Sequence, residues 1–469
     1  MQRTLIKDIS SLVGTQVLVK CWVDVRRDQG KMVFLDLRDV TGKVQAVVLP
    51  NHTEALEVAQ KVRPEWVLAV TAQVNKRPDK NIKADVVNGE VELEVLSIEV
   101  LNVADTPAFD ISTDGHEIGE EVRLEKKYLD LRRPRIQKNI ITRHKVIKYI
   151  RDHLDAQRFI EVETPLLTNP TPEGSRSYLV PSRIWSGEFY ALPQSPQQYK
   201  QLLMSGGFER YFQVAKCMRD EDTRGDRQPE FTQLDIEMSF VTREDVMKLN
   251  EELLVKIVAD LFPEKRIQQI PFPVLTYKEA MEKYNSDKPD LREDKNDPNL
   301  LAFCWVIDFP AFERTGADNV DGTGDWTFTH NPFTGVKNEF IKDLEEKKNI
   351  GDIISTQYDI AMNGYEIGGG GIRLHKAEHL KKVFEIMGYG DERIETNFGH
   401  MLRALASGTP PHGGIAWGLD RLLMILLNEP NIREVIAFPK TGEGKDLLMQ
   451  APSPAPEKTL KELGISVKK

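Results

Sequence analysis

Two short stretches far apart in the chain carry residues that together suit a nucleotide. Arg219, Asp220 and Glu221 precede an arginine-rich loop that leads into residues 228–235. The second stretch, residues 413–421, ends in Gly-Leu-Asp-Arg. An arginine can hold phosphate oxygens and stabilise charge in a transition state, and an aromatic ring can cover one side of a purine. We therefore expect the two stretches to form one nucleotide site.

Residues 231–238 alternate in character, as a strand with two different faces does. One face is apolar and is expected to join a core: Leu234, Ile236 and Met238. The other face carries a ring, an amide and two carboxylates: Phe231, Gln233, Asp235 and Glu237. A purely structural strand rarely gathers such groups, so this face is predicted to line a site.

The arginines of these stretches also have an ordinary explanation. Arg219 or Arg227 could each form a surface ion pair with a nearby aspartate, and such pairs contribute little to stability. Arg421, however, falls in the first turn of a helix opened by Gly418. There it can cover one side of a purine while Phe231 covers the other. We prefer the nucleotide interpretation for the group as a whole.

A third group combines carboxylates, glycines and an arginine. Asp359 and Glu366 precede four consecutive glycines and Arg373. Two carboxylates without a histidine suit Mg²⁺, and Arg373 offers a bidentate fork to a small carboxylate. Because Glu366 and Arg373 are an odd number of residues apart, the strand must bend or bulge to bring both to one face. The alternative is a glycine-rich hairpin with a solvated arginine.

The first 105 residues are expected to form a small barrel of the OB type. Valines at alternate positions and the segments 33–38 and 44–48 indicate short strands. Phe34 points away from the barrel interior among charged neighbours, where a ring can stack on an unpaired base. The alternative is that Phe34 caps a second apolar layer.

The rest of the chain must position the nucleotide site. After a hinge at residues 106–135, we expect a helix over 136–154 and a strand over 161–167 that is stopped by a proline. Residues 136–450 mix strands and helices without the regular alternation of a parallel sheet, and they contain no P-loop. They are predicted to form an antiparallel sheet flanked by helices, followed by a C-terminal tail at 451–469. The fold class is therefore α+β with several domains.

Composition is that of an ordinary folded protein. The 469 residues exceed the usual size of a single core, and a net charge of −10 argues against a general nucleic-acid coat protein. Three scattered cysteines (Cys21, Cys217 and Cys304) predict neither a disulfide framework nor a zinc site, and they suit a reducing cytoplasm. The first residues do not resemble a signal peptide, and no apolar run approaches a membrane span.

Nearly the whole chain resembles the bacterial-type aspartyl-tRNA synthetases, which are class II aminoacyl-tRNA synthetases. The two stretches described first match motifs two and three of that class, and residues 228–231 distinguish the family from its asparagine and archaeal relatives. Further short segments that match the family lie along the chain at residues 128–134, 171–174, 194–197, 286–292, 305–310 and 438–440.

The resemblance implies that the aspartate α-carboxylate attacks the α-phosphorus of ATP. Aspartyl-adenylate and pyrophosphate form, and the aspartyl group then passes to the 3′ end of tRNA-Asp. ATP and Mg²⁺ are the implied substrate and cofactor, and a homodimer is the implied assembly. Whether tRNA-Asn is also charged stays open, because Gln29 stands at a position where the family varies with this property.

The resemblance also implies individual roles. Arg219 and Arg421 would be the catalytic residues. Aspartate would be bound by Glu173, Gln197, Lys200, Arg219, Asp235, His330 and Arg373. ATP would be bound by Arg219, Asp220, Glu221, Arg227, Gln228, Phe231, Glu366, Gly418, Leu419, Asp420 and Arg421. Mg²⁺ would be bound by Asp359 and Glu366. The anticodon would be read by Arg27, Phe34 and Gln45, and Pro165 would lie at the dimer interface.

The sequence departs from the family pattern in one large respect. Bacterial members usually carry an extra domain between motifs two and three, whereas here a short loop near 293–302 stands in its place. A smaller departure is Met218, where phenylalanine is usual before the motif-two arginine. Two other interpretations remain: a binding paralogue would have lost catalytic residues, and an enzyme for asparagine or lysine would need a different set than Lys200, Asp235 and Arg373.

Overall fold

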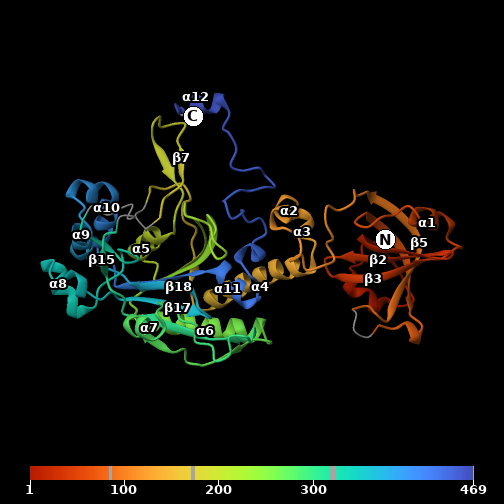
Figure 1. Ribbon diagram of the computed structural model, residues 1–469, viewed down its shortest axis with the longest axis horizontal. Coiled ribbons are helices and arrows are strands. Elements are labelled where there is room, and N and C mark those ends of the chain that lie inside the picture. Colours follow the sequence, from red (N-terminus) through yellow and green to blue (C-terminus); the bar gives the residue numbers. More distant parts are fainter. Residues whose placement is uncertain (84–86, 171–174, 317–323, 468–469) are drawn as a thin grey trace. The chain divides into compact units, whose positions relative to one another are not determined.

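The computed structural model describes residues 1–83, 87–170, 175–316 and 324–467 (Figure 1). The chain divides into two compact units, Met1–Gly115 and His116–Lys469.

The first unit is a closed five-stranded barrel in the order β1-β2-β3-β5-β4. All neighbouring strands are antiparallel except β3 and β5. A 3₁₀ helix (η1, Ile6–Leu12) and helix α1 (Thr53–Ala59) pack on it, and a short 3₁₀ turn (η2, Asp79–Asn81) precedes the last strand. The strands are β1 (Gln16–Gln29), β2 (Met32–Asp39), β3 (Gly42–Val48), β4 (Val67–Lys76) and β5 (Val91–Asn102). The predicted OB-type barrel is confirmed.

Strand β2 shows the predicted alternation. Val33, Leu35 and Leu37 lie in the barrel core, with at most 2% of their surface exposed. Phe34 lies on the outer face, outside this core, and is directly opposite Arg27 on β1. The Arg27 guanidinium donates two hydrogen bonds of 2.8 Å to Asp36. The outer face therefore combines a partly exposed ring with fixed charges.

The second unit is built on an eight-stranded sheet in the order β12-β14-β17-β18-β19-β10-β9-β6. The six central strands are antiparallel, as predicted, and the edge strands β12 and β6 pair in parallel with their neighbours. The strands are β6 (Ile160–Glu161), β9 (Arg210–Met218), β10 (Glu230–Ser239), β12 (Val274–Thr276), β14 (Phe303–Ile307), β17 (Gln357–Met362), β18 (Tyr365–Ile372) and β19 (His412–Gly418). The sheet is therefore mixed, with an antiparallel centre.

One predicted strand is much shorter than expected. The structure has a strand here, β6, that comprises only Ile160–Glu161. Most of the predicted segment 161–167 therefore lies outside the sheet. Pro165 has no N–H to offer a neighbouring strand, and it is exposed. The chain therefore leaves the sheet early, and the prediction of a strand through Leu167 is wrong.

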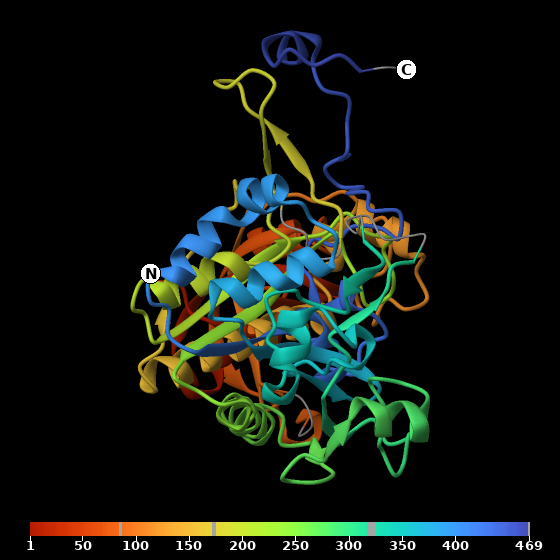
Figure 2. The same cartoon turned by 90° about the vertical axis from the view of Figure 1, so that its left-hand side faces the viewer.

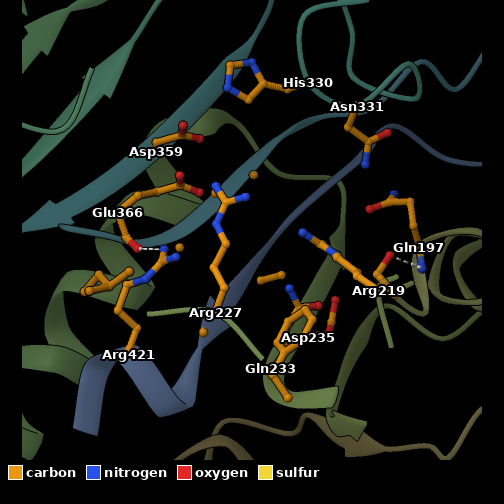
Figure 3. A pocket seen from close by; sticks show the side chains of 18 of the residues that line it. Gln197, Arg219, Arg227, Gln233, Asp235, His330, Asn331, Asp359, Glu366 and Arg421 are labelled. Carbon is orange, nitrogen blue, oxygen red and sulfur yellow. Dashed lines mark hydrogen bonds between the residues drawn. The ribbon is translucent and has the colours of Figure 1, made fainter. Parts of the chain in front are cut away.

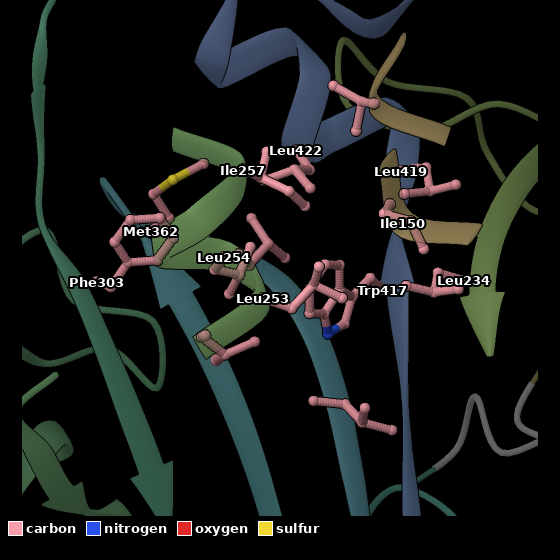
Figure 4. Close-up of a cluster of buried hydrophobic side chains, with 14 of the residues drawn as sticks. Ile150, Leu234, Leu253, Leu254, Ile257, Phe303, Met362, Trp417, Leu419 and Leu422 are labelled. Atoms are coloured by element: carbon pink, nitrogen blue, oxygen red, sulfur yellow. The ribbon is translucent and has the colours of Figure 1, made fainter. Parts of the chain in front are cut away.

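Three helices cover one face of the sheet: α4 (Pro134–Ala156), α6 (Arg243–Leu261) and α11 (Leu419–Leu426). Helix α6 begins with a reciprocal capping box between Thr242 and Asp245. The helices pack against Leu234, Ile236 and Met238 of β10 and against Trp417 of β19 (Figure 4). This core fixes β10 so that its polar residues face the other side of the sheet.

The opposite side of the sheet carries helix α5 (Gln197–Ser205) and a second apolar cluster. Helices α8 (Ile341–Glu346), α9 (Ala377–Ile386) and α10 (Asp391–Ala406) contribute to this cluster.

Further short elements complete the unit. Among them, the hairpin of β7 (Leu179–Pro181) and β8 (Phe189–Ala191) and the helix α12 (Glu457–Glu462) project from it (Figure 2). The other short elements are α2 (Glu120–Glu125), α3 (Lys127–Asp130), β11 (Arg266–Ile267), α7 (Tyr277–Tyr284), β13 (Leu300–Leu301), β15 (Phe312–Arg314), β16 (Trp326–Phe328), η3 (Asn338–Phe340), η4 (Ile350–Asp352) and η5 (Ile432–Val435).

The loop near 293–302 is short and well anchored. Lys265 Nζ donates to the Pro298 carbonyl at 2.7 Å, and the Arg266 backbone N–H donates to the Asn299 carbonyl at 2.9 Å. The three cysteines are buried and not joined by a disulfide. Across the described residues, no helix is both long enough and apolar enough to cross a membrane.

A buried charge cluster ties residues 123–135 to η5. Arg123 donates to both oxygens of Asp130 (2.9 and 3.1 Å) and to both oxygens of Glu434 (3.0 and 2.7 Å). Lys127 and Arg133 also donate to Asp130, at 2.8 and 2.9 Å. Burial alone would raise the pKa of Asp130, but these donors outweigh it and hold that pKa at about 2, below the ordinary 3.8.

We expect Asp130→Asn to lower the free energy of unfolding by about 3 kcal/mol at pH 6, because it leaves buried cations without their carboxylate. The contribution of the lowered pKa is complete above pH 4 and is lost as the pH falls towards 2. The difference between wild type and variant should therefore shrink as the pH falls from 5 to 3. Urea unfolding at a series of pH values measures it, and a constant difference would contradict the assignment.

Candidate active site

A cavity of about 450 Å³ lies on the polar side of the sheet, above β10, β18 and β19 (Figure 3). Its walls come from α5, the loop between β9 and β10, residues 329–334, β17 and the first turn of α11. Most of the residues expected to form the site line it: Gln197, Lys200, Arg219, Glu221, Arg227, Gln228, Phe231, Asp235, His330, Asp359, Glu366, Arg373, Gly418, Asp420 and Arg421. The structure thus brings the three sequence groups together.

Some residues named from the sequence lie elsewhere. Asp220 is exposed beside the cavity, and its backbone N–H donates to the Arg176 carbonyl at 3.0 Å. The Leu419 side chain is fully buried in the apolar core, because the first turn of α11 directs it towards the helices. Pro165 is exposed on the second unit, and Glu173 lies outside the described residues. Arg27, Phe34 and Gln45 belong to the barrel.

The floor of the cavity holds four buried charges that balance one another. Lys200 Nζ lies 3.1 Å from Asp235 Oδ1 and 3.3 Å from Glu237 Oε2. Arg373 donates through Nε and Nη2 to the two oxygens of Glu237, at 2.9 and 3.2 Å. None of the four is more than 4% exposed. Because buried charges need partners, two cations and two carboxylates here form a stable, neutral set.

Asp235 keeps one oxygen for a ligand. Its Oδ2 is buried and has no hydrogen-bond partner among the residues that the structure describes. Burial raises the pKa of Asp235, with Lys200 opposing, whereas Arg373 and Lys200 lower the pKa of Glu237 despite its burial. A bound ammonium group would satisfy Oδ2 and favour the ionised carboxylate. Asp235 is thus suited to an amino group, and Lys200 and Arg373 to a carboxylate.

A chain of hydrogen bonds fixes Gln197 at the cavity wall. Gln197 Nε2 donates to Gln201 Oε1 at 2.9 Å, and Gln201 Nε2 lies 3.1 Å from His412 Nε2. His412 Nδ1 lies 2.8 Å from the Pro410 carbonyl. Nδ1 must therefore carry the proton and Nε2 must accept. This leaves the Gln197 oxygen available as an acceptor in the cavity.

The nucleotide side of the cavity holds an aromatic ring and several arginines. The Arg219 guanidinium lies over the Phe231 ring, 5.1 Å from its centre. Arg227 lines the cavity and also forms an ion pair with Glu221 at 3.3 Å. Arg421 donates to the Glu366 backbone carbonyl and to Asp226 at 3.0 Å (Figure 3). Arg219 therefore lies on the ring, and Arg227 and Arg421 line the same cavity.

Asp359 and Glu366 lie on neighbouring strands, with His330 close by (Figure 3). Burial and then the nearby Glu366 raise the pKa of Asp359 well above its ordinary value, and burial lowers the pKa of His330. Gln357 Nε2 orients Asp359 through a hydrogen bond of 3.0 Å. The described residues contain no cluster of three or more His, Cys, Asp and Glu suited to a metal.

The expected irregularity in β18 is present. Gly368 faces Ile360 and Glu366 faces Ala361, so Ile367 is an extra residue between them. The Ile367 side chain is buried in the core and also borders the cavity, and Glu366 and Arg373 both line the cavity. The glycines leave the space that this needs: a Cβ on Gly369 would lie 2.7 Å from Asp359 Oδ1.

The cavity also contains residues that were not singled out as site residues. They are Ser195, Asp222, Asp226, Thr329, Asn331, Thr334, Gln357, Ile367, Ala416 and Ile432. Residues 329–334 belong to an irregular segment after β16, where no periodicity marks a cavity-facing position. Thr329 Oγ1 is buried and has no hydrogen-bond partner within the described part of the chain, which suits contact with a ligand.

Comparison with known proteins supports one family. The model for tRNA synthetases class II (D, K and N) matches residues 119–442, and the model for the OB-fold nucleic acid binding domain matches residues 17–101. Similar proteins include the aspartate–tRNA(Asp/Asn) ligase of Rubrobacter xylanophilus, 39% identical over 98% of this chain and 95% of the relative. The aspartate–tRNA ligase of Geobacillus kaustophilus is 38% identical over 97% of each chain.

The alignment with the Rubrobacter protein extends over 581 residues, more than the 469 of this chain, so that relative has residues without a counterpart here. Among solved structures, the asparaginyl-tRNA synthetase of Pyrococcus horikoshii, complexed with asparaginyl-adenylate, superposes with a TM-score of 0.76. It is 22% identical over 94% of this chain and 98% of that one, so the likeness establishes the fold. The chain belongs to the tRNA synthetases of class II, in the group specific for D, K and N.

Proposed function

We propose that this protein is an aspartate–tRNA ligase that activates L-aspartate with ATP and transfers it to the 3′ end of tRNA-Asp. The observation that carries the proposal is the set Lys200, Asp235, Glu237 and Arg373 beside the Phe231 ring. An acidic amino acid needs cations for its side chain and an anion for its ammonium group. The set offers both, next to a surface for a purine.

The proposed reaction needs no protein nucleophile. Lys200 and Arg373 would hold the side-chain carboxylate, and Asp235 Oδ2 would accept a hydrogen bond from the ammonium group. The α-carboxylate would then face the Arg219 side of the cavity, where it attacks the α-phosphorus of ATP and displaces pyrophosphate. Arg219 and Arg421 would stabilise the charge that develops on the phosphate oxygens. Positioning and electrostatics can supply the whole rate enhancement in phosphoryl-type transfer.

Mg²⁺ fits the pair Asp359 and Glu366. Burial and then the nearby Glu366 carboxylate raise the pKa of Asp359, and a divalent cation would offset both effects. Two protein ligands suit Mg²⁺, which takes its remaining oxygens from phosphates and water. When bound, the ion would neutralise charge on the phosphates of ATP. Gly369 keeps the space beside Asp359 clear.

The proposed partners follow from the remaining surfaces. The outer face of β2 and β3, with Arg27, Phe34 and Gln45, would read the anticodon by stacking and hydrogen bonding. The exposed segment around Pro165 would join two copies into a homodimer. Buried cysteines without disulfides suit a cytoplasmic enzyme.

Amino-acid-dependent exchange of pyrophosphate into ATP tests the proposal. We expect exchange with aspartate, and at least 100-fold lower kcat/KM with asparagine or lysine, because an asparagine side chain offers Lys200 and Arg373 no negative charge and a lysine side chain adds a third cation. Charging of purified tRNA-Asp and tRNA-Asn in parallel then defines the tRNA scope. A folded protein that charges neither tRNA with aspartate would contradict the proposed function.

A further inference from the structure

Residues 431–446, which follow helix α11, lie along the nucleotide loop, residues 219–229 between β9 and β10. We call residues 431–446 the brace. The Ile432 backbone N–H donates to the Gly225 carbonyl at 3.0 Å, and Thr223 Oγ1 donates to the Gly442 carbonyl. The Ile432 side chain itself lines the cavity. The loop that carries Arg219 and Arg227 is therefore attached to the brace at several points.

The brace has firm anchors of its own. Glu434 accepts two hydrogen bonds from Arg123, as described above, and another of 2.8 Å from Arg135. Asn139 donates to the Glu434 backbone carbonyl at 3.1 Å. At the far end, Asp446 and Ala451 exchange two backbone hydrogen bonds of 2.7 and 3.0 Å, which close a local turn. The bonds to Glu434 therefore hold the first part of the brace in place, and the nucleotide loop is attached to that part through Ile432.

Lys440 connects the brace to strand β10. Its ammonium group lies 3.1 Å from Glu230 Oε1 and 3.2 Å from Asp446 Oδ2, so it joins the start of β10 to the far end of the brace. Burial alone would lower the pKa of Lys440, but these carboxylates outweigh it and raise that pKa. The side chain is therefore charged at neutral pH.

The backbone of Lys440 sets the orientation of Gln228. The Lys440 N–H donates to Gln228 Oε1 at 2.7 Å. Because a backbone N–H can only donate, the other end of the Gln228 amide must be its NH₂ group. That Nε2 is buried and finds no hydrogen-bond partner among the described residues, and Gln228 lines the cavity. Gln228 is thereby presented to a ligand as a donor, which suits a phosphate or a purine acceptor.

We propose that Lys440 is a positioning residue for the nucleotide: its ammonium group clamps the brace to β10, and this fixes Gln228 as a hydrogen-bond donor to ATP. The inference rests on the proposed function only in that ATP is the nucleotide. It assigns a role to the segment Phe438-Pro439-Lys440, which contributes to the family resemblance but has no part in the chemistry described above. Lys440 does not touch the substrate and acts through Gln228.

The test compares Lys440→Met with Lys440→Arg and with Lys445→Met. Lys445 lies in the same segment, is exposed, and forms a local ion pair with Glu443 at 2.6 Å, so it controls for loss of a lysine. In aspartate-dependent pyrophosphate exchange, we expect Lys440→Met to raise the KM for ATP about tenfold. The KM for aspartate should stay within about twofold, Lys440→Arg should restore most of the ATP affinity, and Lys445→Met should match wild type.

Amide hydrogen exchange of the full-length protein without ligand gives a second readout. We expect faster exchange in residues 219–230 of Lys440→Met than in Lys445→Met, with unchanged protection in β17 and β19. If Lys440→Met does not fold, Asp446→Asn weakens the same clamp and should shift both readouts in the same direction. An unchanged KM for ATP together with unchanged exchange in residues 219–230 would overturn the inference. Absence of aspartate-dependent exchange in wild type would instead contradict the proposed function.

Discussion

Arg219→Ala is expected to abolish adenylate formation, lowering kcat for aspartate-dependent pyrophosphate exchange by about 10³-fold or more. Arg219 comes from the end of β9, lies over Phe231 and reaches the part of the cavity between the buried charge set and the nucleotide side. A cation at this point can contact both the attacking carboxylate and the α-phosphate. Its loss removes transition-state stabilisation that Arg421, which is held by the Glu366 carbonyl and by Asp226, would not restore.

The fold should survive this substitution. The contact that the structure shows for the Arg219 side chain is its stacking on a ring, whereas the loop is closed by a backbone hydrogen bond of 2.8 Å from Arg219 to Pro229. Arg224→Ala is the matched control, because Arg224 belongs to the same loop, is exposed and does not line the cavity. Thermal unfolding and exchange kinetics are measured on both variants. Near-normal exchange in Arg219→Ala would refute the assigned role.

Asp235→Asn is expected to raise the KM for aspartate by about 10²- to 10³-fold while leaving the KM for ATP within a few-fold. The substitution keeps the shape of the side chain but removes the charge that would pair with the ammonium group. It also places an NH₂ group where the structure has a buried acceptor without a partner. Lys200 keeps Glu237 as a partner at 3.3 Å, so the fold should lose little stability.

The pH dependence of the same variant adds a separate check. Burial raises the pKa of Asp235, so in the wild type the aspartate KM should rise as acidification protonates this carboxylate. In Asp235→Asn that rise should be absent. Asp260→Asn is a suitable control, because Asp260 is exposed, does not line the cavity and accepts a hydrogen bond of 2.5 Å from Tyr149. An aspartate KM that is unchanged by Asp235→Asn would rule out the proposed orientation of the substrate.

The parts of the site that the sequence predicts are those governed by local geometry. The period of two in residues 231–238 is sufficient to place Phe231 and Asp235 opposite Leu234, and the structure agrees. The odd spacing between Glu366 and Arg373 is sufficient to require an irregular strand, because side-chain direction in a strand depends only on residue count.

Other parts depend on tertiary arrangement and leave no local pattern. The pairing of Lys200 with Glu237 requires α5 to pack against β10 in one position, which nothing in either segment specifies alone. Thr329 and Asn331 come from an irregular segment, and Ile432 from a single 3₁₀ turn. The strand expected through Leu167 is absent, because β6 ends at Glu161 and Pro165 has no N–H to donate to a neighbouring strand.

The extra residue at Ile367 makes the length of the glycine run as important as its composition. Gly369, Gly371 and Arg373 share one side of β18, whereas Gly368 and Gly370 approach Trp417 and Tyr358 in the core. Removing or adding one residue between Ile367 and Arg373 would exchange these sides and carry the guanidinium from the cavity into the core. A change of two residues would restore the side but shift the arginine by about 7 Å along the strand. The number of residues in β18 between Ile367 and Arg373 therefore decides whether the Arg373 guanidinium reaches the same cavity as Asp359 and Glu366.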